Sequence, residues 1–243
     1  MRIQLAWTML TELVVMFSGI LLLKLAATLL GPVGFGEYAL SRRAVSLLYL
    51  PLVMGLGIAS PRYIAIVRAG ALESYSERSF AAVTLTAGLL PALLVAGVLN
   101  VRADWAAMLL FGTTDLDTLV RPATVALAGI AFHSMVYAIY RGRSEMGSAN
   151  FLQLINLGIL PVVAFALASH DAASVLAATG CGWLIVSGIA LLRVLYRERQ
   201  NDLEGGASLG DHLRLLLRFG LPRVPGEFAL VGLFAIPSLI AVR

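Results

Sequence analysis

The chain has 243 residues, of which 59% are hydrophobic and only 13% charged, and its net charge is +4. Because a soluble domain carries about 25% charged residues, this composition excludes an ordinary water-exposed globular protein and is typical of a chain surrounded by lipid. The basic residues lie between apolar runs and do not form one patch, which argues against a nucleic-acid partner. We therefore expect an all-α, polytopic membrane helix bundle.

Seven apolar runs predict membrane spans, since a helix needs about 20 mostly apolar residues to cross the hydrocarbon. These runs cover residues 8–30, 41–65, 79–100, 118–140, 151–169, 172–194 and 219–241. The first run resembles a signal peptide only superficially, because Glu12 and Lys24 interrupt it and further spans follow. The single cysteine, Cys181, lies inside the sixth run, where we expect a small packing residue.

Arginine placement predicts that the N-terminus is cytoplasmic and that the last span runs outward. With this orientation the cytoplasmic stretches hold most of the arginines, namely Arg2, Arg62, Arg68, Arg78, Arg141, Arg143, Arg193, Arg197, Arg199, Arg214 and Arg218. The outer loop around Ser169–Ser174 holds none. Between the third and fourth spans, Val101–Asp117 predicts a short helix at the outer interface, anchored by Trp105.

Three segments follow from this pattern. Residues 1–200 form a six-helix transmembrane lobe, and residues 201–218 form a cytoplasmic loop with an amphipathic helix, because leucines alternate there with Arg214 and Arg218. Residues 219–243 form a seventh span. The connections are short, and the sequence suggests no separate soluble domain.

The stretch GPVGFGEY, between the first two runs, looks at first like a phosphate-binding loop. A phosphate loop needs its glycines between a strand and a helix, with a lysine and a serine or threonine closing the motif. This stretch has no such lysine, follows a membrane helix and faces outward. We expect a tight turn between two spans, and no nucleotide or other cofactor.

Longer stretches carry a resemblance to a known family. LLGPVGFGEYAL followed by SLLYLPLVMGLGIASPRYIA resembles the first two spans of the polysaccharide-biosynthesis, or O-antigen, flippases of the multidrug/oligosaccharidyl-lipid/polysaccharide exporter superfamily. That family's first outer turn, L-G-P-x-x-[YF]-G-x-[YF], matches Leu30–Tyr38, and its glycine-rich second span with a basic-aromatic exit matches Gly55–Tyr63. ANFLQLINLGILPVVAF and LLRFGLPRVPGEFALVGLFAIPSLI fit later segments. Family members have twelve to fourteen spans in two six-helix lobes, so the resemblance implies a fragment or a truncated gene. In that case residues 219–243 are the first span of a truncated C-terminal lobe.

The resemblance implies a transporter and not an enzyme. Its substrate would be a lipid-linked oligosaccharide of the undecaprenyl-pyrophosphate type, destined for lipopolysaccharide or exopolysaccharide and flipped across the bacterial inner membrane by alternating access. The implied partners are this lipid, the surrounding membrane lipids, a polysaccharide polymerase and glycosyltransferases. The alternatives are a multidrug or cation antiporter of the same superfamily, or a non-transporting, truncated membrane protein.

Cations inside the predicted spans are the candidate substrate-binding residues. A charged side chain near the bilayer centre costs about 2.5–3.5 kcal/mol on insertion scales, so its presence calls for a reason. Lys24, the only lysine among 18 basic residues, lies past the middle of the first span, and Arg42 and Arg43 open the second span from outside. They would attract a pyrophosphate in a cavity, or simply reach the headgroups as snorkelling side chains.

Glu12, Glu227 and His133 are candidates for proton or ion coupling. Glu227 lies four residues after Arg223, so a local ion pair is the simpler alternative. His133 shares a helical face with Tyr137, and a helix-to-helix hydrogen bond is the simpler alternative there. We find no spacing typical of metal ligands and no catalytic triad.

Overall fold

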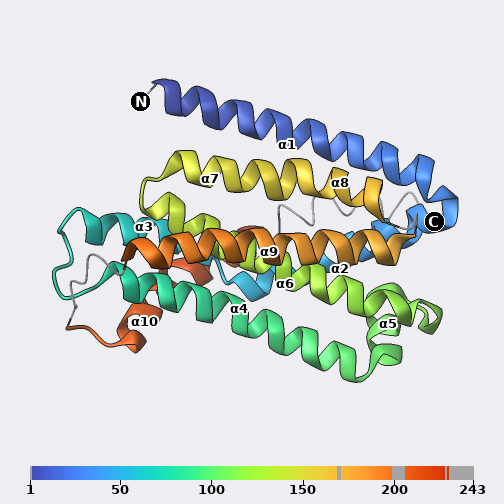
Figure 1. Ribbon diagram of the computed structural model, residues 1–243. Helices are drawn as coiled ribbons and strands as arrows, with labels where there is room; N and C mark the ends of the chain where they lie inside the picture. Colours follow the sequence, from blue (N-terminus) through green and yellow to red (C-terminus); the bar gives the residue numbers. More distant parts are fainter. Residues whose placement is uncertain (1, 169–170, 199–205, 228, 230–243) are drawn as a thin grey trace.

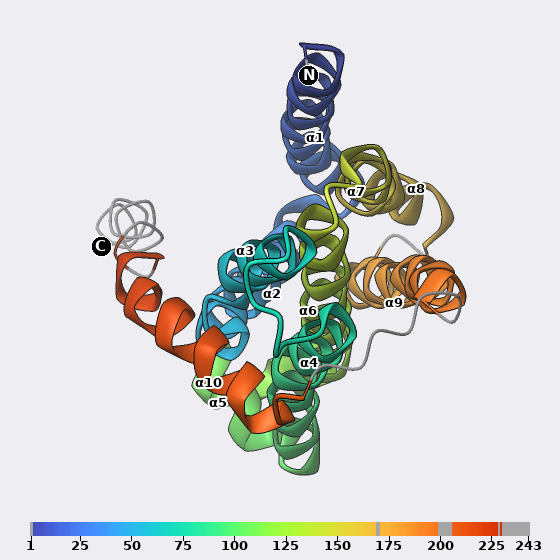
Figure 2. The ribbon, with the colours of Figure 1, turned by 90° about the vertical axis from the view of Figure 1, so that its left-hand side faces the viewer.

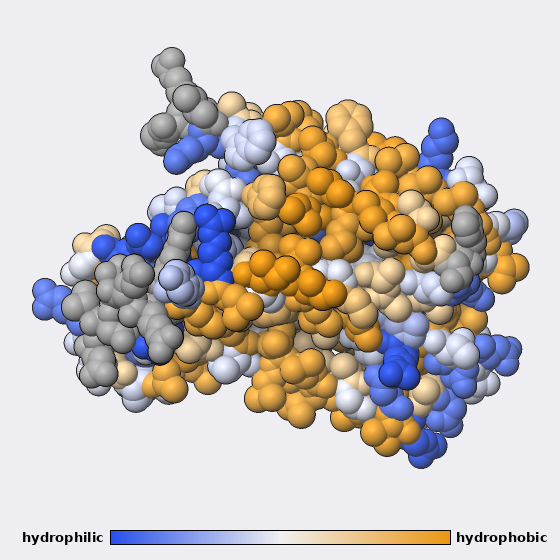
Figure 3. All heavy atoms as spheres, viewed as in Figure 1, coloured by the Kyte–Doolittle hydropathy of each residue, from blue (hydrophilic) through white to orange (hydrophobic). Residues whose placement is uncertain are grey.

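The computed structural model describes residues 2–168, 171–198, 206–227 and 229 of the chain (Figure 1). Within these ranges the chain is helical and contains no strand. Six helical segments are long and apolar enough to cross a bilayer, by length and composition. Hydrophobic residues cover the middle of the face shown in Figure 3, whereas many hydrophilic residues lie toward its two ends. The chain is therefore an all-α, polytopic helix bundle, as the composition predicts.

The first two spans are α1 (Arg2–Leu29) and the pair α2 (Gly31–Val53) and α3 (Leu56–Arg68). Only Leu30 separates α1 from α2, and Gly31 adopts a φ of 68° that glycine tolerates easily. The remaining residues of GPVGFGEY lie in the first turns of α2, with Pro32 in the first turn, where proline is accepted. The turn is thus real but much shorter than expected, and the second span begins ten residues earlier than predicted.

A break at Met54 and Gly55 divides the second span. Both residues have positive φ values, 50° and 68°. Gly55 also lies against Gly220, because a Cβ at Gly55 would approach the Gly220 carbonyl oxygen to 2.5 Å. The glycine-rich stretch VMGLG therefore provides both the break in the helix and a close contact with a distant segment.

The third and fourth spans are α4 (Glu77–Val101) and α6 (Val120–Gly142). Between them lie α5 (Ala103–Phe111) and the 3₁₀ helix η1 (Thr114–Leu119), where a short interfacial helix is predicted, and Trp105 is exposed. The span that contains α6 is the most buried of the six, because 72% of its most apolar stretch is buried inside the protein. It packs against α2, α3, α4 and α9, so α6 is the central helix of the bundle.

The fifth span consists of α7 (Met146–Gln153), the π-helical segment η2 (Leu154–Ile159) and α8 (Leu160–Leu167), and the sixth is α9 (Ala172–Glu198). Glycines bring α9 close to its neighbours: a Cβ at Gly180 would approach the backbone of Ala126 in α6 to 2.7 Å. Cys181, expected as a packing residue, is instead exposed. It points away because the adjacent Gly180 occupies the side of α9 that faces α6.

After the sixth span, α10 (Leu209–Gly220) and the 3₁₀ helix η3 (Leu221–Arg223) follow. A capping box starts α10. The Asp211 backbone N–H donates to the Ser208 hydroxyl, and the Ser208 backbone N–H donates to the Asp211 carboxylate. The hydrogen bond from the Ser208 hydroxyl holds the pKa of Asp211 below its ordinary value.

The amphipathic character of α10 is confirmed, but its buried stripe packs on protein. His212, Leu216 and Gly220 are buried at every fourth position and face α3 and α4. The helix runs two residues beyond the predicted end at 218. The predicted boundary at residue 200 and most of the predicted seventh span, 219–241, lie outside the described residues.

The arrangement of the ends agrees with the predicted alternation of the spans. The start of α1, the connection from α3 to α4 and α10 all lie at one end of the bundle, and α5 lies at the other (Figure 1). We refer to the first as the arginine-rich end. Figure 2 shows α1 at one side of the bundle, beside α7 and α8 and away from α4. Accordingly the first span is the least buried, at 17%.

Candidate functional site

Lys24, the first predicted cation, lies on the uncovered side of α1. The buried residues of this helix are Thr11, Leu22 and Ala26, and Leu22 and Ala26 pack with Phe165 of α8. At about 100° per residue, Lys24 points roughly opposite to this stripe, and it is exposed. It also lies about 8 Å from the outer end of α1, within reach of headgroups. No described helix covers this ammonium group.

Arg42 and Arg43 lie in the middle of α2, not at the outer entrance of the second span. The prediction of their position is wrong because α2 already begins at Gly31, about three turns before Arg42. Arg42 is exposed, and its guanidinium carbon lies 5.7 Å from the centroid of the Tyr38 ring, within cation–π range.

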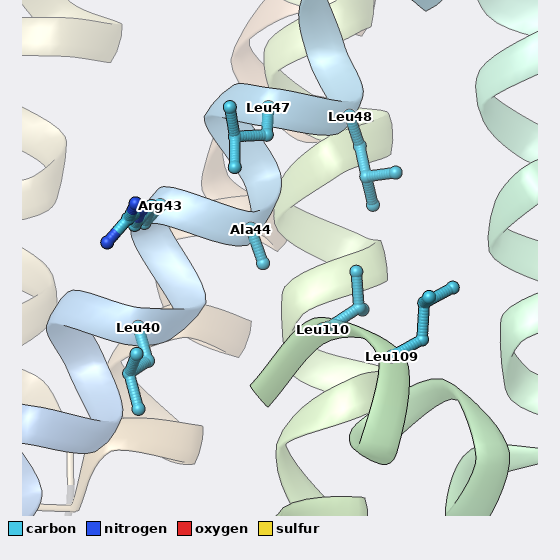
Figure 4. A pocket seen from close by; sticks show the side chains of 7 residues that line it. All are labelled: Leu40, Arg43, Ala44, Leu47, Leu48, Leu109 and Leu110. Carbon is cyan, nitrogen blue, oxygen red and sulfur yellow. The ribbon is translucent and has the colours of Figure 1, made fainter. Parts of the chain in front are cut away.

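Arg43 borders a hollow of about 320 Å³ between α2 and α5 (Figure 4). Its other lining residues are Leu40, Ala44, Leu47, Leu48, Leu109 and Leu110. In Figure 4 the guanidinium points away from Leu109 and Leu110. An apolar hollow of this kind suits a lipid chain or a neighbouring side chain better than a sugar.

Glu12 and His133, the acidic and imidazole candidates of the lobe, each form a hydrogen bond with an amide side chain of the fifth span. We call these amides and their polar partners the polar seam. Its members are Thr8 and Glu12 of α1, His133 of α6, Asn150 and Gln153 of α7, Asn156 of η2, and Ser187 of α9. The seam joins four of the six spans through polar side chains that are largely withdrawn from lipid. Such links are a common means of holding membrane helices together.

At the α1 side of the seam, Gln153 Nε2 donates to Glu12 Oε1 over 3.0 Å, and Asn150 Nδ2 donates to Thr8 Oγ1 over 2.9 Å. Glu12 itself is exposed, whereas Gln153 is only 7% exposed. Gln153 Oε1 is buried and has no hydrogen-bond partner among the described residues. A carboxylate on the surface of the helix thus contacts an amide with an unused acceptor.

Deeper in the lobe, Asn156 Nδ2 lies 2.9 Å from His133 Nδ1 and donates to Ser187 Oγ over 3.0 Å. The backbone carbonyl of Asn156 also accepts from the Trp183 indole N–H. His133 is 3% exposed and stacks on Tyr137, with ring centroids 5.9 Å apart. The expected helix-to-helix hydrogen bond of His133 is therefore present. Its role in coupling stays a prediction.

Glu227, the remaining candidate, lies shortly after η3 and is half-buried. The ion pair expected between Arg223 and Glu227 is not formed. Arg223 instead donates from Nη1 to the Phe219 carbonyl over 2.6 Å and lies over the Phe219 ring.

The structure thus places Glu12 and His133 in separate hydrogen-bonded groups on the fifth span and joins none of the predicted cations to either group. Among the described residues, no ion pair links Lys24, Arg42 or Arg43 to an acid within 4.0 Å. Within the same residues, no group of three His, Cys, Asp or Glu side chains is placed to hold a metal ion.

The amides of the seam were missed in the sequence, although a signal was present. Asn150, Gln153 and Asn156 recur at every third position in ANFLQLIN, an otherwise apolar segment. Residues three apart lie on one face of a helix, so this spacing indicates a polar stripe. Arg62 and Phe219, which pack near Arg223, have no comparable signal because they come from segments far apart in the chain.

Comparison with known protein families, curated proteins and solved structures finds no match for this chain.

Proposed function

We propose that the chain is the N-terminal part of an exporter that flips lipid-linked oligosaccharides, of the undecaprenyl-pyrophosphate type, across the bacterial inner membrane. The supporting observation is the exposure of charged side chains within spans: Glu12 and Lys24 in α1, and Arg42 in α2. The motifs that resemble the polysaccharide flippases provide the substrate class.

Exposed charges on spans are costly when they face hydrocarbon, by about 2.5–3.5 kcal/mol each on insertion scales. Glu12 and Lys24 lie twelve residues apart, which separates them by about 120° around α1. A single neighbouring helix, packed on one side of α1, would therefore not shield both charges from lipid. A polar path along α1, bounded by a second lobe, would keep both in water.

The signs of the charges suit an anionic cargo. A pyrophosphate group would be attracted by Lys24 and Arg42, whereas the polyprenyl chain would stay in lipid beside the bundle. Glu12, bonded to Gln153 at the edge of the seam, is placed to exchange a proton with such a path. Alternating access would then expose the path to each side of the membrane in turn.

The test is export of surface glycan in the host, with Lys24→Gln and the double variant Arg42→Gln, Arg43→Gln in the full-length protein. We expect each to lower glycan export about tenfold or more, because a charge-assisted contact to phosphate is lost. Protein levels in the membrane should be unchanged. The matched control is Arg102→Gln, an exposed arginine between α4 and α5. Normal export in both variants would refute this site, and normal export in a host that lacks the protein would refute this function.

A multidrug or cation antiporter is the second candidate, favoured by the contact between Glu12 and Gln153. In that case Glu12→Gln and Glu227→Gln should abolish drug resistance, and Lys24→Gln should leave it unchanged. For a glycan exporter, expression of the chain should confer no drug resistance that depends on these acids. Parallel drug-resistance and glycan-export assays on the same variants therefore separate the two functions.

A further inference from the structure

Two arginines from distant segments share one aromatic ring at the arginine-rich end. The guanidinium carbon of Arg62, in α3, lies 4.3 Å from the centroid of the Phe219 ring, and that of Arg223, in η3, lies 3.6 Å from it. Both distances are within the range of cation–π attraction. The two guanidinium carbons are therefore at most about 8 Å apart, since both lie so close to one centroid.

The backbone around Phe219 is fixed by close contacts. Gly220 meets the break between α2 and α3, because a Cβ at Gly220 would approach the Met54 carbonyl oxygen to 2.5 Å. The Phe219 ring meets the edge or face of Tyr63 in a T-shaped contact, with centroids 6.0 Å apart. Arg223 is further held by its hydrogen bond to the Phe219 carbonyl. The two cations thus rest on a supported platform.

The charges on this platform are not balanced by nearby acids. Among the described carboxylates, none lies within 4.0 Å of Arg62 or Arg223. Both arginines are exposed, so their unused N–H groups are accessible. Two like charges held this close favour the binding of an anion that contacts both of them.

The spacing fits a phosphate group. Charge-assisted N–H···O bonds are about 2.7–2.9 Å long, which places a guanidinium carbon about 4 Å from the phosphorus atom it contacts. Two guanidinium groups that contact one phosphate are therefore at most about 8 Å apart, and the separation of Arg62 and Arg223 is within this limit. Arginine also presents a planar fork that matches phosphate oxygens better than lysine does.

The location fits the headgroup of a lipid. Arg62 lies six residues before the end of α3 at Arg68, or about 9 Å inside the arginine-rich end. Lipid phosphates lie in the interfacial layer just outside the hydrocarbon, and a long arginine side chain near the end of a span reaches this layer. A phosphate anchored in the membrane would therefore reach the platform without leaving the bilayer.

We propose that Arg62 and Arg223, supported by Phe219, form a cytoplasmic binding site for the diphosphate of a lipid-linked sugar. This inference rests on the proposed function, and it adds a site at which the cargo binds before it is flipped. A diphosphate is preferred to an ordinary phosphodiester lipid because it carries more negative charge and offers oxygens to both guanidinium groups at once.

The experiment measures lipid binding to the purified full chain in detergent by native mass spectrometry. The probes are undecaprenyl diphosphate and phosphatidylglycerol. The variants are Arg62→Gln, Arg223→Gln and Arg62→Lys, and the matched control is Arg214→Gln, an exposed arginine of α10. Thermal unfolding of each variant shows whether it is folded, and Arg62→Lys keeps the charge if Arg62→Gln does not fold.

We expect undecaprenyl diphosphate to bind the unmodified chain at least about tenfold more tightly than phosphatidylglycerol. Arg62→Gln and Arg223→Gln should each weaken it about tenfold or more, Arg62→Lys should weaken it less, and Arg214→Gln should not change it.

Three results would overturn the inference in different ways. Equal binding of the diphosphate by the unmodified chain and the variants would exclude this site and leave the proposed function standing. Equal binding of the two lipids, lost together in the variants, would assign the site to ordinary anionic lipids. A lack of diphosphate binding by the unmodified chain would remove the site and count against the proposed function, which glycan export by a host with and without the protein tests separately.

Discussion

Arg143 is buried at the arginine-rich end of α6, where its side chain is only 4% exposed. Its Nε lies 2.5 Å from Glu77 Oε1 in the first turn of α4, and Arg68 Nη1 of α3 lies 3.7 Å from the other carboxylate oxygen. One glutamate therefore joins the ends of three helices. A charge buried to this degree is destabilising once its partner is removed.

We predict that Glu77→Gln lowers the free energy of unfolding by about 1–3 kcal/mol, because Arg143 then keeps its charge with a weaker acceptor. The measurement is thermal or denaturant unfolding of the purified protein in detergent. Asp104→Asn serves as the control, since Asp104 pairs with Arg102 in full exposure at the other end, and exposed pairs contribute little. Equal effects of the two substitutions would show that the pair does not join the helices.

At the scale of helices, glycine placement decides how closely the central pair α6 and α9 can approach. Gly129 of α6 and Gly180 of α9 face one another, and a Cβ at Gly129 would meet the Gly180 carbonyl oxygen at 2.7 Å. Close backbone contact through small residues is a main source of helix association in membranes, where water exclusion contributes little.

We predict that Gly180→Ala destabilises the bundle by about 1–3 kcal/mol, since its Cβ would meet backbone atoms of α6 that cannot move independently. Gly188→Ala, in the same helix, would meet only Phe132 Cε1 at 3.9 Å and should be neutral or slightly stabilising through better helix propensity. Unfolding in detergent and retention of the monomer peak in gel filtration provide the readout. The packing explanation fails if Gly180→Ala is as stable as Gly188→Ala.

Helices could be predicted from the sequence more reliably than their ends. Apolar length identified each of the six described spans, because a bilayer imposes a minimum run of apolar residues. It did not show that α2 begins at Gly31, since proline and glycine permit a helix start as readily as a turn. Nor did it place the buried stripe of α10 on α3 and α4, because lipid and protein make the same demand on an apolar face.

The candidate site was predicted only in its parts. A single charge inside an apolar run is visible in the sequence, as for Glu12 and Lys24. Partners are not visible, because the contact of Glu12 with Gln153 joins residues 141 positions apart. The same holds for Arg62 and Arg223, which meet at Phe219 only after α10 has packed against α3.

At the scale of the whole molecule, the uncovered charges of α1 and α2 determine how the chain is interpreted. If they face lipid, the lobe is a membrane anchor with snorkelling side chains. If they face water, the lobe is one wall of a polar path, as the proposed function requires. Labelling of single cysteines makes this distinction, once the exposed native Cys181 is replaced by alanine.

The most direct measurement is labelling of single cysteines by a membrane-impermeant maleimide, in intact cells and in inside-out vesicles, on the full-length protein with Cys181→Ala. Glu12→Cys, Lys24→Cys and Arg42→Cys report on the charged positions, and Ile189→Cys, an exposed apolar position of α9, reports on lipid. We predict that the three charged positions react at least about tenfold faster than position 189, because maleimides react with the thiolate, which forms in water. Reaction as slow as at position 189 for all three would place these side chains in lipid and contradict a polar path along the lobe.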